Sequence, residues 1–176
     1  MGYYDIMEIM YESAEVTYEV VALMTGNAWA MLGAALAVIL PGIGAAYGMS
    51  WVQQASAGLV SEQPEKFGKT MILQLIPSSA ALYGFVVAFL VMLTAVLGDV
   101  GYTAQEGVLI MVACLPIAFV GMFATLAQAK VATAGIRMIG KDESLSGRAI
   151  TMSVFIELFT LFSLIVSILS VFSIGA

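Results

Sequence analysis

The chain has 176 residues, of which 61% are apolar and 10% are charged, and its formal net charge is −6. A soluble core of this composition leaves too few polar residues to cover its surface, whereas four apolar stretches approach or exceed the ~20 residues that cross a bilayer as a helix. The composition therefore predicts an integral membrane protein. One cysteine, Cys114, and no histidine exclude a disulfide framework or a Cys/His metal cluster.

The first segment, residues 1–27, is acidic. Its carboxylates recur at steps of three and four residues, so a helix there carries one acidic stripe: Asp5, Glu8, Glu12, Glu15 and Glu19. Gly26 and Asn27 predict a break before the first membrane span. We expect an extracytoplasmic helix at the membrane interface, with its acidic face in water. A sharper hypothesis is an external collar that attracts cations. No basic region precedes a short apolar stretch with a cleavage site, so we expect no signal peptide.

The remaining chain predicts four spanning helices, because a lone strand leaves its backbone unsatisfied in lipid. They cover residues 28–55, 70–97, 107–136 and 149–173. Every basic residue falls in or beside the loops that join spans one to two and three to four: Lys66, Lys69, Lys130, Arg137, Lys141 and Arg148. The positive-inside rule places these two loops in the cytoplasm, and both termini and the loop at residues 98–106 outside.

The two halves of the chain resemble each other at a constant offset of 79 residues. Seven identities align without a gap, and Lys69 meets Arg148. The identical pairs are Ala34 with Ala113, Leu36 with Leu115, Gly42 with Gly121, Ala45 with Ala124, Val52 with Val131, Ala55 with Ala134 and Gly68 with Gly147. This pattern indicates a tandem, parallel duplication of one helical hairpin, with hairpins at residues 28–97 and 107–176.

The two helices of a hairpin differ in side-chain size. Eleven of the 21 residues from 28 to 48 are Gly or Ala, whereas residues 150–172 contain none. Small residues let helix backbones approach closely, and bulky apolar residues suit a lipid-facing surface. We therefore expect spans one and three to crowd together, with spans two and four outside them.

Glu157 is the only carboxylate set deep inside an apolar span. An ionisable group there is costly unless it has partners or a cation to carry, so it indicates ion transport. Gln128, Ser78 and Ser79 lie at the same depth, ~13–15 Å from the basic boundary residues. Tyr83 lies one turn beyond Ser79 on the same helical face. Lys130 points to the face opposite Gln128, which argues against a counter-ion role.

Four stretches of the chain resemble a known family. They are GIGAAYG at residues 42–48, QPEKFGKTMILQLIPSSAALYGFVVAFL at 63–90, LPIAFVGMFATLAQAKVATAGI at 115–136, and the carboxylate in VFIEL. This pattern resembles the duplicated proteolipid of V-type and A-type rotary ATPases, the rotor-ring component known as subunit K in bacterial sodium-pumping members. The resemblance covers about 150 residues, and the acidic N-terminal segment lies outside it.

The resemblance implies an all-α protein that assembles with identical copies into a ring, with spans one and three inside. Each copy carries one cation, Na⁺ or H⁺, on Glu157. The implied ligands are Glu157, Gln128 and Ser79 for sodium, with Tyr83, Ser78 and the backbone carbonyl of Ile76 beside Pro77. Sodium-binding members have a glutamine at the position of Ala80, so one ligand is missing here; Gln128 nevertheless favours sodium over a proton.

The resemblance also implies several partners. These are a stator subunit with an essential arginine, a central-stalk subunit at the cytoplasmic loops, and membrane lipid; we expect no organic cofactor and no nucleic acid. The expected location is a prokaryotic plasma membrane. No phosphate-binding glycine-rich loop occurs, so the chain is expected to be non-catalytic. The alternative is a small four-helix secondary transporter coupled to a cation or proton, but such carriers favour inverted repeats over parallel ones.

Overall fold

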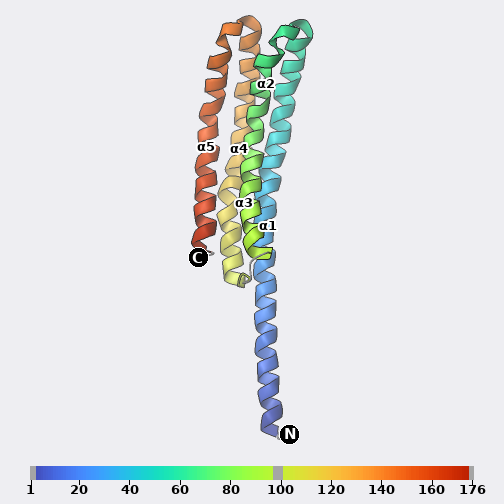
Figure 1. Ribbon diagram of the computed structural model, residues 1–176, viewed down its shortest axis with the longest axis vertical. Coiled ribbons are helices and arrows are strands. Elements are labelled where there is room, and N and C mark those ends of the chain that lie inside the picture. The colour runs from blue at the N-terminus through green and yellow to red at the C-terminus, as the bar shows by residue number, and fades with distance from the viewer. Residues whose placement is uncertain (1–2, 97–100, 175–176) are drawn as a thin grey trace.

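The computed structural model describes residues 3–96 and 101–174, and these ranges are helical with short connections. The elements are α1 (Tyr3–Glu62), α2 (Phe67–Leu75), α3 (Ser79–Val96), α4 (Ala104–Lys141) and α5 (Ser146–Ile174), with 3₁₀ turns at Pro64–Lys66, Ile76–Ser78 and Glu143–Leu145. They form four roughly parallel rods, with α2 and α3 making one rod (Figure 1). In the described ranges, four segments are long and apolar enough to cross a membrane. The predicted all-α, four-span architecture is therefore confirmed.

Both hairpin turns lie at one end of the bundle, and the end of α3, the start of α4 and the end of α5 lie at the other (Figure 1). This arrangement brings the basic loops together, as the parallel repeat predicts. The helices extend beyond the predicted spans at most ends, because polar residues of the turns continue the helical backbone. Residues 98–100 of the predicted external loop, and residue 97 at the end of the predicted second span, lie outside the described residues.

The predicted break at Gly26 and Asn27 is wrong. Helix α1 runs without interruption from Tyr3 to Glu62 and leaves the bundle along its own axis (Figure 1). Gly26 is buried because the backbone of Tyr102 and Thr103 packs directly against it, and the Asn27 Oδ1 accepts a hydrogen bond of 2.9 Å from the Tyr102 N–H. The dipeptide therefore holds the backbone of Tyr102 and Thr103 against α1. Because α1 has no break there, nothing turns residues 3–25 toward the membrane interface, where we expected them to lie.

Helices α1 and α4 pack closely through small residues, as predicted. A Cβ added to Gly44 would lie 2.7 Å from the Met122 carbonyl oxygen, and one added to Gly48 would lie 2.9 Å from the Ala129 Cβ. A Cβ added to Gly33 would lie 2.6 Å from the Met111 Cα. Larger side chains at these positions would force the helices apart, so the glycines set the interhelical distance.

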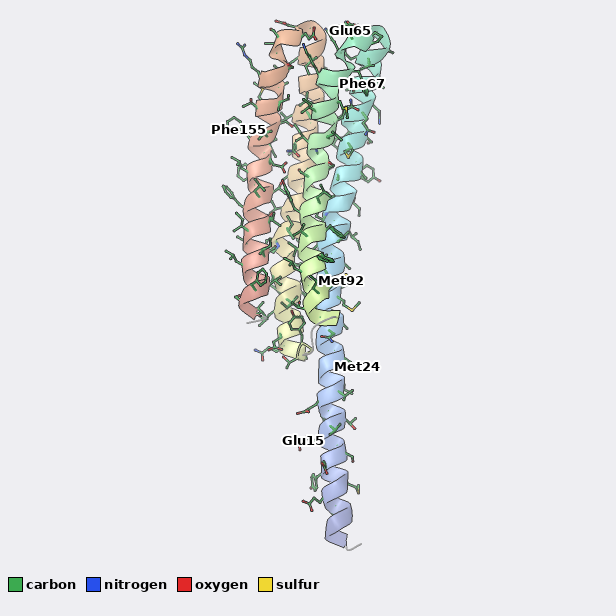
Figure 2. The ribbon with its side chains drawn as sticks, in the orientation of Figure 1. Glu15, Met24, Glu65, Phe67, Met92 and Phe155 are labelled. Atoms are coloured by element: carbon green, nitrogen blue, oxygen red, sulfur yellow. The ribbon has the colours of Figure 1, made fainter. Side chains whose placement is uncertain are left out.

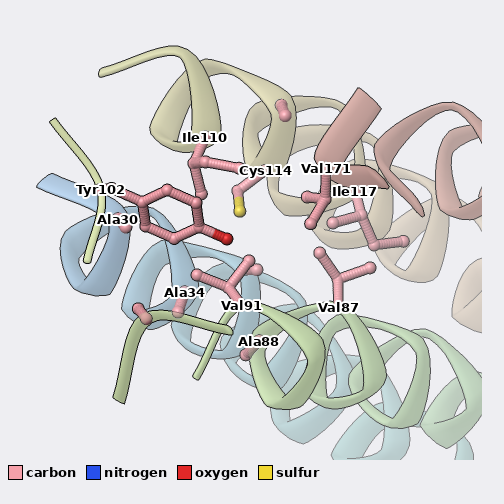
Figure 3. Close-up of a cluster of buried hydrophobic side chains, with 13 residues drawn as sticks. Ala30, Ala34, Val87, Ala88, Val91, Tyr102, Ile110, Cys114, Ile117 and Val171 are labelled. Atoms are coloured by element: carbon pink, nitrogen blue, oxygen red, sulfur yellow. The ribbon is translucent and has the colours of Figure 1, made fainter. Parts of the chain in front are cut away.

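A buried hydrophobic cluster joins α1, α3, α4 and α5 near the end of the bundle that is opposite the basic turns (Figure 3). Val87 and Val91 of α3 face Ile117 and Cys114 of α4 across it. Tyr102 closes the cluster, and its hydroxyl donates a hydrogen bond of 2.5 Å to the Thr94 Oγ1. This core fixes α3 against α4 and thereby the position of α3 residues nearer the middle of the span.

The outer surfaces of α3 and α5 remain apolar and exposed. Phe155 on α5 and Met92 on α3 point away from the bundle (Figure 2). Phe85 stacks on Phe89 on the exposed side of α3, with ring centroids 6.0 Å apart. Large exposed apolar side chains on a spanning helix suit contact with lipid or with other membrane helices.

The two basic turns are tied to each other. The Lys66 ammonium is buried and donates hydrogen bonds of 3.0 Å to the carbonyl oxygens of Ile139 and Gly140, in the last turn of α4. Lys69 forms an ion pair with Glu143. A lysine at a helix C-terminus satisfies carbonyls that have no helical partner. The first hairpin turn therefore caps a helix of the second hairpin, which holds both turns as one unit.

Candidate functional site

Glu157 and Gln128 meet between α5 and α4. The Gln128 side chain is 2% exposed, and its Nε2 donates a hydrogen bond of 2.7 Å to the Glu157 Oε2. The same nitrogen also donates to the Ser153 carbonyl oxygen over 3.3 Å. A buried amide that donates to a carboxylate makes a charge-assisted hydrogen bond, which is stronger than a neutral one. Gln128 therefore fixes both the height and the orientation of the carboxylate.

Helix α3 contributes the third side of the site. Tyr83 lies near the Glu157 carboxylate and the Ser79 hydroxyl. Tyr83 also packs against the hydrophobic cluster that joins α3 and α4, which holds its ring in place. Three predicted residues, Glu157, Gln128 and Tyr83, thus come together, with Ser79 beside them.

Pro77 breaks the helical hydrogen-bonding pattern beside the site, as its missing N–H predicts. Residues Ile76–Ser78 form a 3₁₀ turn between α2 and α3. The Ile76 carbonyl oxygen accepts from the Ser79 N–H and also from the Ser79 hydroxyl, the latter over 3.0 Å. The Ser78 hydroxyl donates to the Leu75 carbonyl over 2.6 Å. Both serines therefore bond within their own turn, and the proposed roles of Ser78 and Ile76 as ligands stay predictions.

Ser153 is a member of the site that sequence reasoning missed. It lies one helical turn before Glu157 on α5, it is fully buried, and its carbonyl contacts Gln128. Its Oγ and the Glu157 Oε1 are the buried side-chain oxygens without a hydrogen-bond partner in the described part of the chain. The i, i+4 spacing of a serine and a carboxylate is the signal in the sequence that would have identified it.

Lys130 lies away from the carboxylate, as predicted. It is exposed and lines an α1–α4 groove of about 350 Å³ with Trp51, Thr133, Ala134 and Arg137. Elsewhere in the described ranges, no group of three or more His, Cys, Asp or Glu side chains is placed to hold a metal ion. The site around Glu157 instead combines one carboxylate with neutral amide, hydroxyl and carbonyl groups. Such a set suits a proton or a hard monovalent cation.

Comparison with known proteins identifies the family. The family described as the C subunit of ATP synthase matches the chain twice, at residues 32–91 and 111–170. The second match begins 79 residues after the first, which confirms the parallel duplication. At this offset Ser78 is the counterpart of Glu157, so the first hairpin carries a hydroxyl where the second carries the carboxylate.

Curated relatives cover most of the chain. The chain is 40% identical over 146 residues to the V-type sodium ATPase subunit K of Enterococcus hirae, which covers 83% of this chain and 92% of the relative. It is 31% identical over 138 residues to the A-type ATP synthase subunit K of Methanocaldococcus jannaschii, a match that covers 78% of this chain and 59% of the relative. It is 30% identical over 141 residues to the 16 kDa proteolipid subunit c of the V-type proton ATPase of Ovis aries, a match that covers 80% of this chain and 89% of the relative.

The fold and the repeated family match define a membrane proteolipid built from two tandem helical hairpins. The chain belongs to the family of ATP synthase C subunits, and its relatives include subunit K of a V-type sodium ATPase and of an A-type ATP synthase. Proteolipids of this kind form rings and work with other ATPase subunits. The N-terminal part of α1, before residue 32, lies outside the family match.

Proposed function

We propose that this chain is a rotor-ring subunit of a V/A-type ATPase that carries one monovalent cation on Glu157, sodium in preference to a proton. Ion translocation is coupled to rotation of the ring because each carboxylate moves between access pathways as the ring turns. The observation that carries this proposal is that only one of the two Glu157 carboxylate oxygens has a hydrogen-bond partner. Gln128 holds its Oε2 at 2.7 Å, while Oε1 is buried without a partner.

A bare carboxylate in this position is unfavourable in hydrocarbon. An uncompensated buried charge costs several kcal/mol or more, and one hydrogen bond offsets only ~1.5–3 kcal/mol of that. A bound cation neutralises the group and permits its passage past lipid. The carboxylate is left bare only near a cationic group of a partner, which the family resemblance assigns to a stator arginine.

The ring arrangement follows from the same helices. Helices α1 and α4 form the inner layer because their small residues allow close packing, and α3 and α5 form the outer layer next to lipid. The tied turns at Lys66 and Lys69 form a cytoplasmic platform for the central stalk. We expect both termini to be extracytoplasmic, in a prokaryotic plasma membrane, and any ATP chemistry to reside on partner subunits.

Sodium is favoured over a proton by the 40% identity to a relative that is named a sodium ATPase subunit, and by Gln128. A proton remains the second candidate because the chain also resembles proton ATPase proteolipids at about 30% identity. The secondary-transporter alternative is disfavoured by the parallel repeat.

The test is the rate at which a hydrophobic carbodiimide modifies Glu157 in the purified protein, measured across pH with and without sodium. These reagents attack the protonated carboxyl, so a bound ion slows the reaction. We expect modification at Glu157, identified by peptide mapping, and protection by millimolar sodium at constant pH. Modification that depends on pH alone would assign a proton. Absence of modification at Glu157 would overturn the proposed site.

A further inference from the structure

Ser153 differs from several other buried serine and threonine residues of the bundle. Thr125 donates to the Gly121 carbonyl oxygen over 2.6 Å, Thr70 to that of Phe67 over 2.9 Å, and Ser163 to that of Thr160 over 2.7 Å. These bonds within one helix are the ordinary way in which a membrane helix satisfies a hydroxyl. The Ser153 Oγ makes no such bond, although its residue is fully buried.

An unpartnered buried hydroxyl carries a desolvation penalty of ~1–3 kcal/mol. Native structures seldom leave a buried hydroxyl without a hydrogen-bonding partner from the protein, a water or a bound ion. The Ser153 hydroxyl therefore indicates a missing partner, and the position of that partner is restricted by what surrounds it.

The surroundings point to Glu157. Residues four apart lie on one face of a helix, so the Ser153 side chain shares a face of α5 with that of Glu157 and lies one turn nearer the basic turns. A single atom, the Gln128 Nε2, contacts both the Ser153 carbonyl oxygen and the Glu157 Oε2. The two unpartnered oxygens of the described residues thus belong to neighbouring groups of one site.

We propose that the Ser153 Oγ and the Glu157 Oε1 are both ligands of the transported sodium ion, an inference that rests on the proposed function. A hard cation prefers oxygen ligands, and a neutral hydroxyl supplies one without adding charge. Ala80 contributes no side-chain oxygen on the α3 side. In this arrangement α5 supplies two ligands from consecutive turns, and Ser153 sets sodium affinity without being needed for the carboxylate to bind a proton.

The experiment uses the intact purified ring and the carbodiimide reaction with sodium as the probe. In Ser153→Ala, we expect half-protection of Glu157 to require roughly tenfold to hundredfold more sodium, the factor that corresponds to one lost bond to a charged group. The rate without sodium should keep the pH dependence of the unmodified protein, since Glu157 and Gln128 are retained.

Two further variants separate ligation from packing. Ser163→Ala removes another buried hydroxyl from α5, one that bonds to its own helix, and should leave sodium protection unchanged. Ser153→Cys keeps the size of the side chain but replaces oxygen with sulfur, a poor ligand for a hard cation. In Ser153→Cys, half-protection of Glu157 should therefore require more sodium by about the same factor as in Ser153→Ala.

Unchanged sodium protection in Ser153→Ala would overturn this inference and leave Glu157 as the ion carrier. Normal protection in Ser153→Cys would do the same, because it would assign the effect of alanine to a cavity. Absence of sodium protection in the unmodified protein would also overturn it, with a proton as the cargo. Failure of Glu157 to react at all would instead overturn the proposed function itself.

Discussion

Gln128 on α4 and Glu157 on α5 are joined by a hydrogen bond of 2.7 Å between Nε2 and Oε2. The amide is almost completely buried and also contacts the backbone of Ser153, so it connects the two helices of the second hairpin at the carboxylate. Within the described ranges the first hairpin has no equivalent pair, because the counterpart of Glu157 there is Ser78, whose hydroxyl bonds to its own helix. The duplication therefore leaves one carboxylate site for four helices.

Replacement of Gln128 by leucine tests the role of this amide. Gln128→Leu keeps the volume of the side chain but removes a donor whose bond to a charged group is worth ~1.5–3 kcal/mol. We expect at least about tenfold weaker protection of Glu157 by sodium, measured by carbodiimide modification. Gln54→Leu, an exposed position on α1, is the control. Equal protection in both variants would show that the amide does not hold the carboxylate for the ion.

The close packing of α1 on α4 predicts a difference between two glycines of the same helix. Gly44→Ala places a methyl group 2.7 Å from the Met122 carbonyl oxygen, so overpacking should cost ~1–3 kcal/mol. Gly58→Ala meets no atom within 4 Å and should be neutral or stabilising by up to ~1 kcal/mol. Thermal unfolding in detergent should give a lower Tm for Gly44→Ala only. Similar Tm values for the two variants would contradict this close packing.

Much of this fold is predictable because a bilayer restricts the possibilities. Apolar length identifies the four spans, basic residues identify the two turns that lie together, and Gly-rich composition identifies α1 and α4 as the close pair. Gly26 and Asn27 mislead because a local pattern of glycine and asparagine is typical of a helix break. Their actual role, contact with the backbone near Tyr102, depends on residues 75 positions away.

The site is predictable only in part for a similar reason. Glu157 and Gln128 stand out because a carboxylate and an amide are rare in apolar spans and occur at one depth. Ser153 does not stand out, because serines are common in membrane helices and usually bond to their own backbone. Only the direction of its hydroxyl in the folded chain distinguishes it. Lys66 is another such case, since its capping of α4 joins residues 73 and 74 positions apart.

The cap formed by Lys66 predicts a local effect at the cytoplasmic turns. Lys66→Met removes the ammonium that donates to Ile139 and Gly140 and leaves both carbonyls unsatisfied. The loss of such bonds costs ~1–3 kcal/mol, so the last turn of α4 should open more often. Hydrogen exchange of the peptide covering residues 136–145 should accelerate about tenfold. Lys141→Met, an exposed lysine in the same turn, is the control, and equal exchange in both variants would rule out the cap.

The extension of α1 predicts an effect that depends on salt. Glu8, Glu12, Glu15 and Glu19 are exposed, and no basic residue precedes Lys66, so the acids have no counter-charge within their own segment. If the extensions of a ring form a negative collar at the outer surface, they raise the local cation concentration. Screening limits this effect to low salt, since the Debye length falls from ~30 Å at 0.01 M to ~8 Å at 0.15 M.

Replacement of these four glutamates and Asp5 by the corresponding amides should therefore slow transport at about 0.01 M salt and have little effect at about 0.15 M. Helical propensity is nearly unchanged by Glu→Gln, so circular dichroism should report the same helix content. The measurement is the initial rate of cation uptake into vesicles that contain the assembled ATPase. A rate that is equal to that of the unmodified complex at both salt concentrations would remove the collar hypothesis and leave the acidic stripe as a solvated helix face.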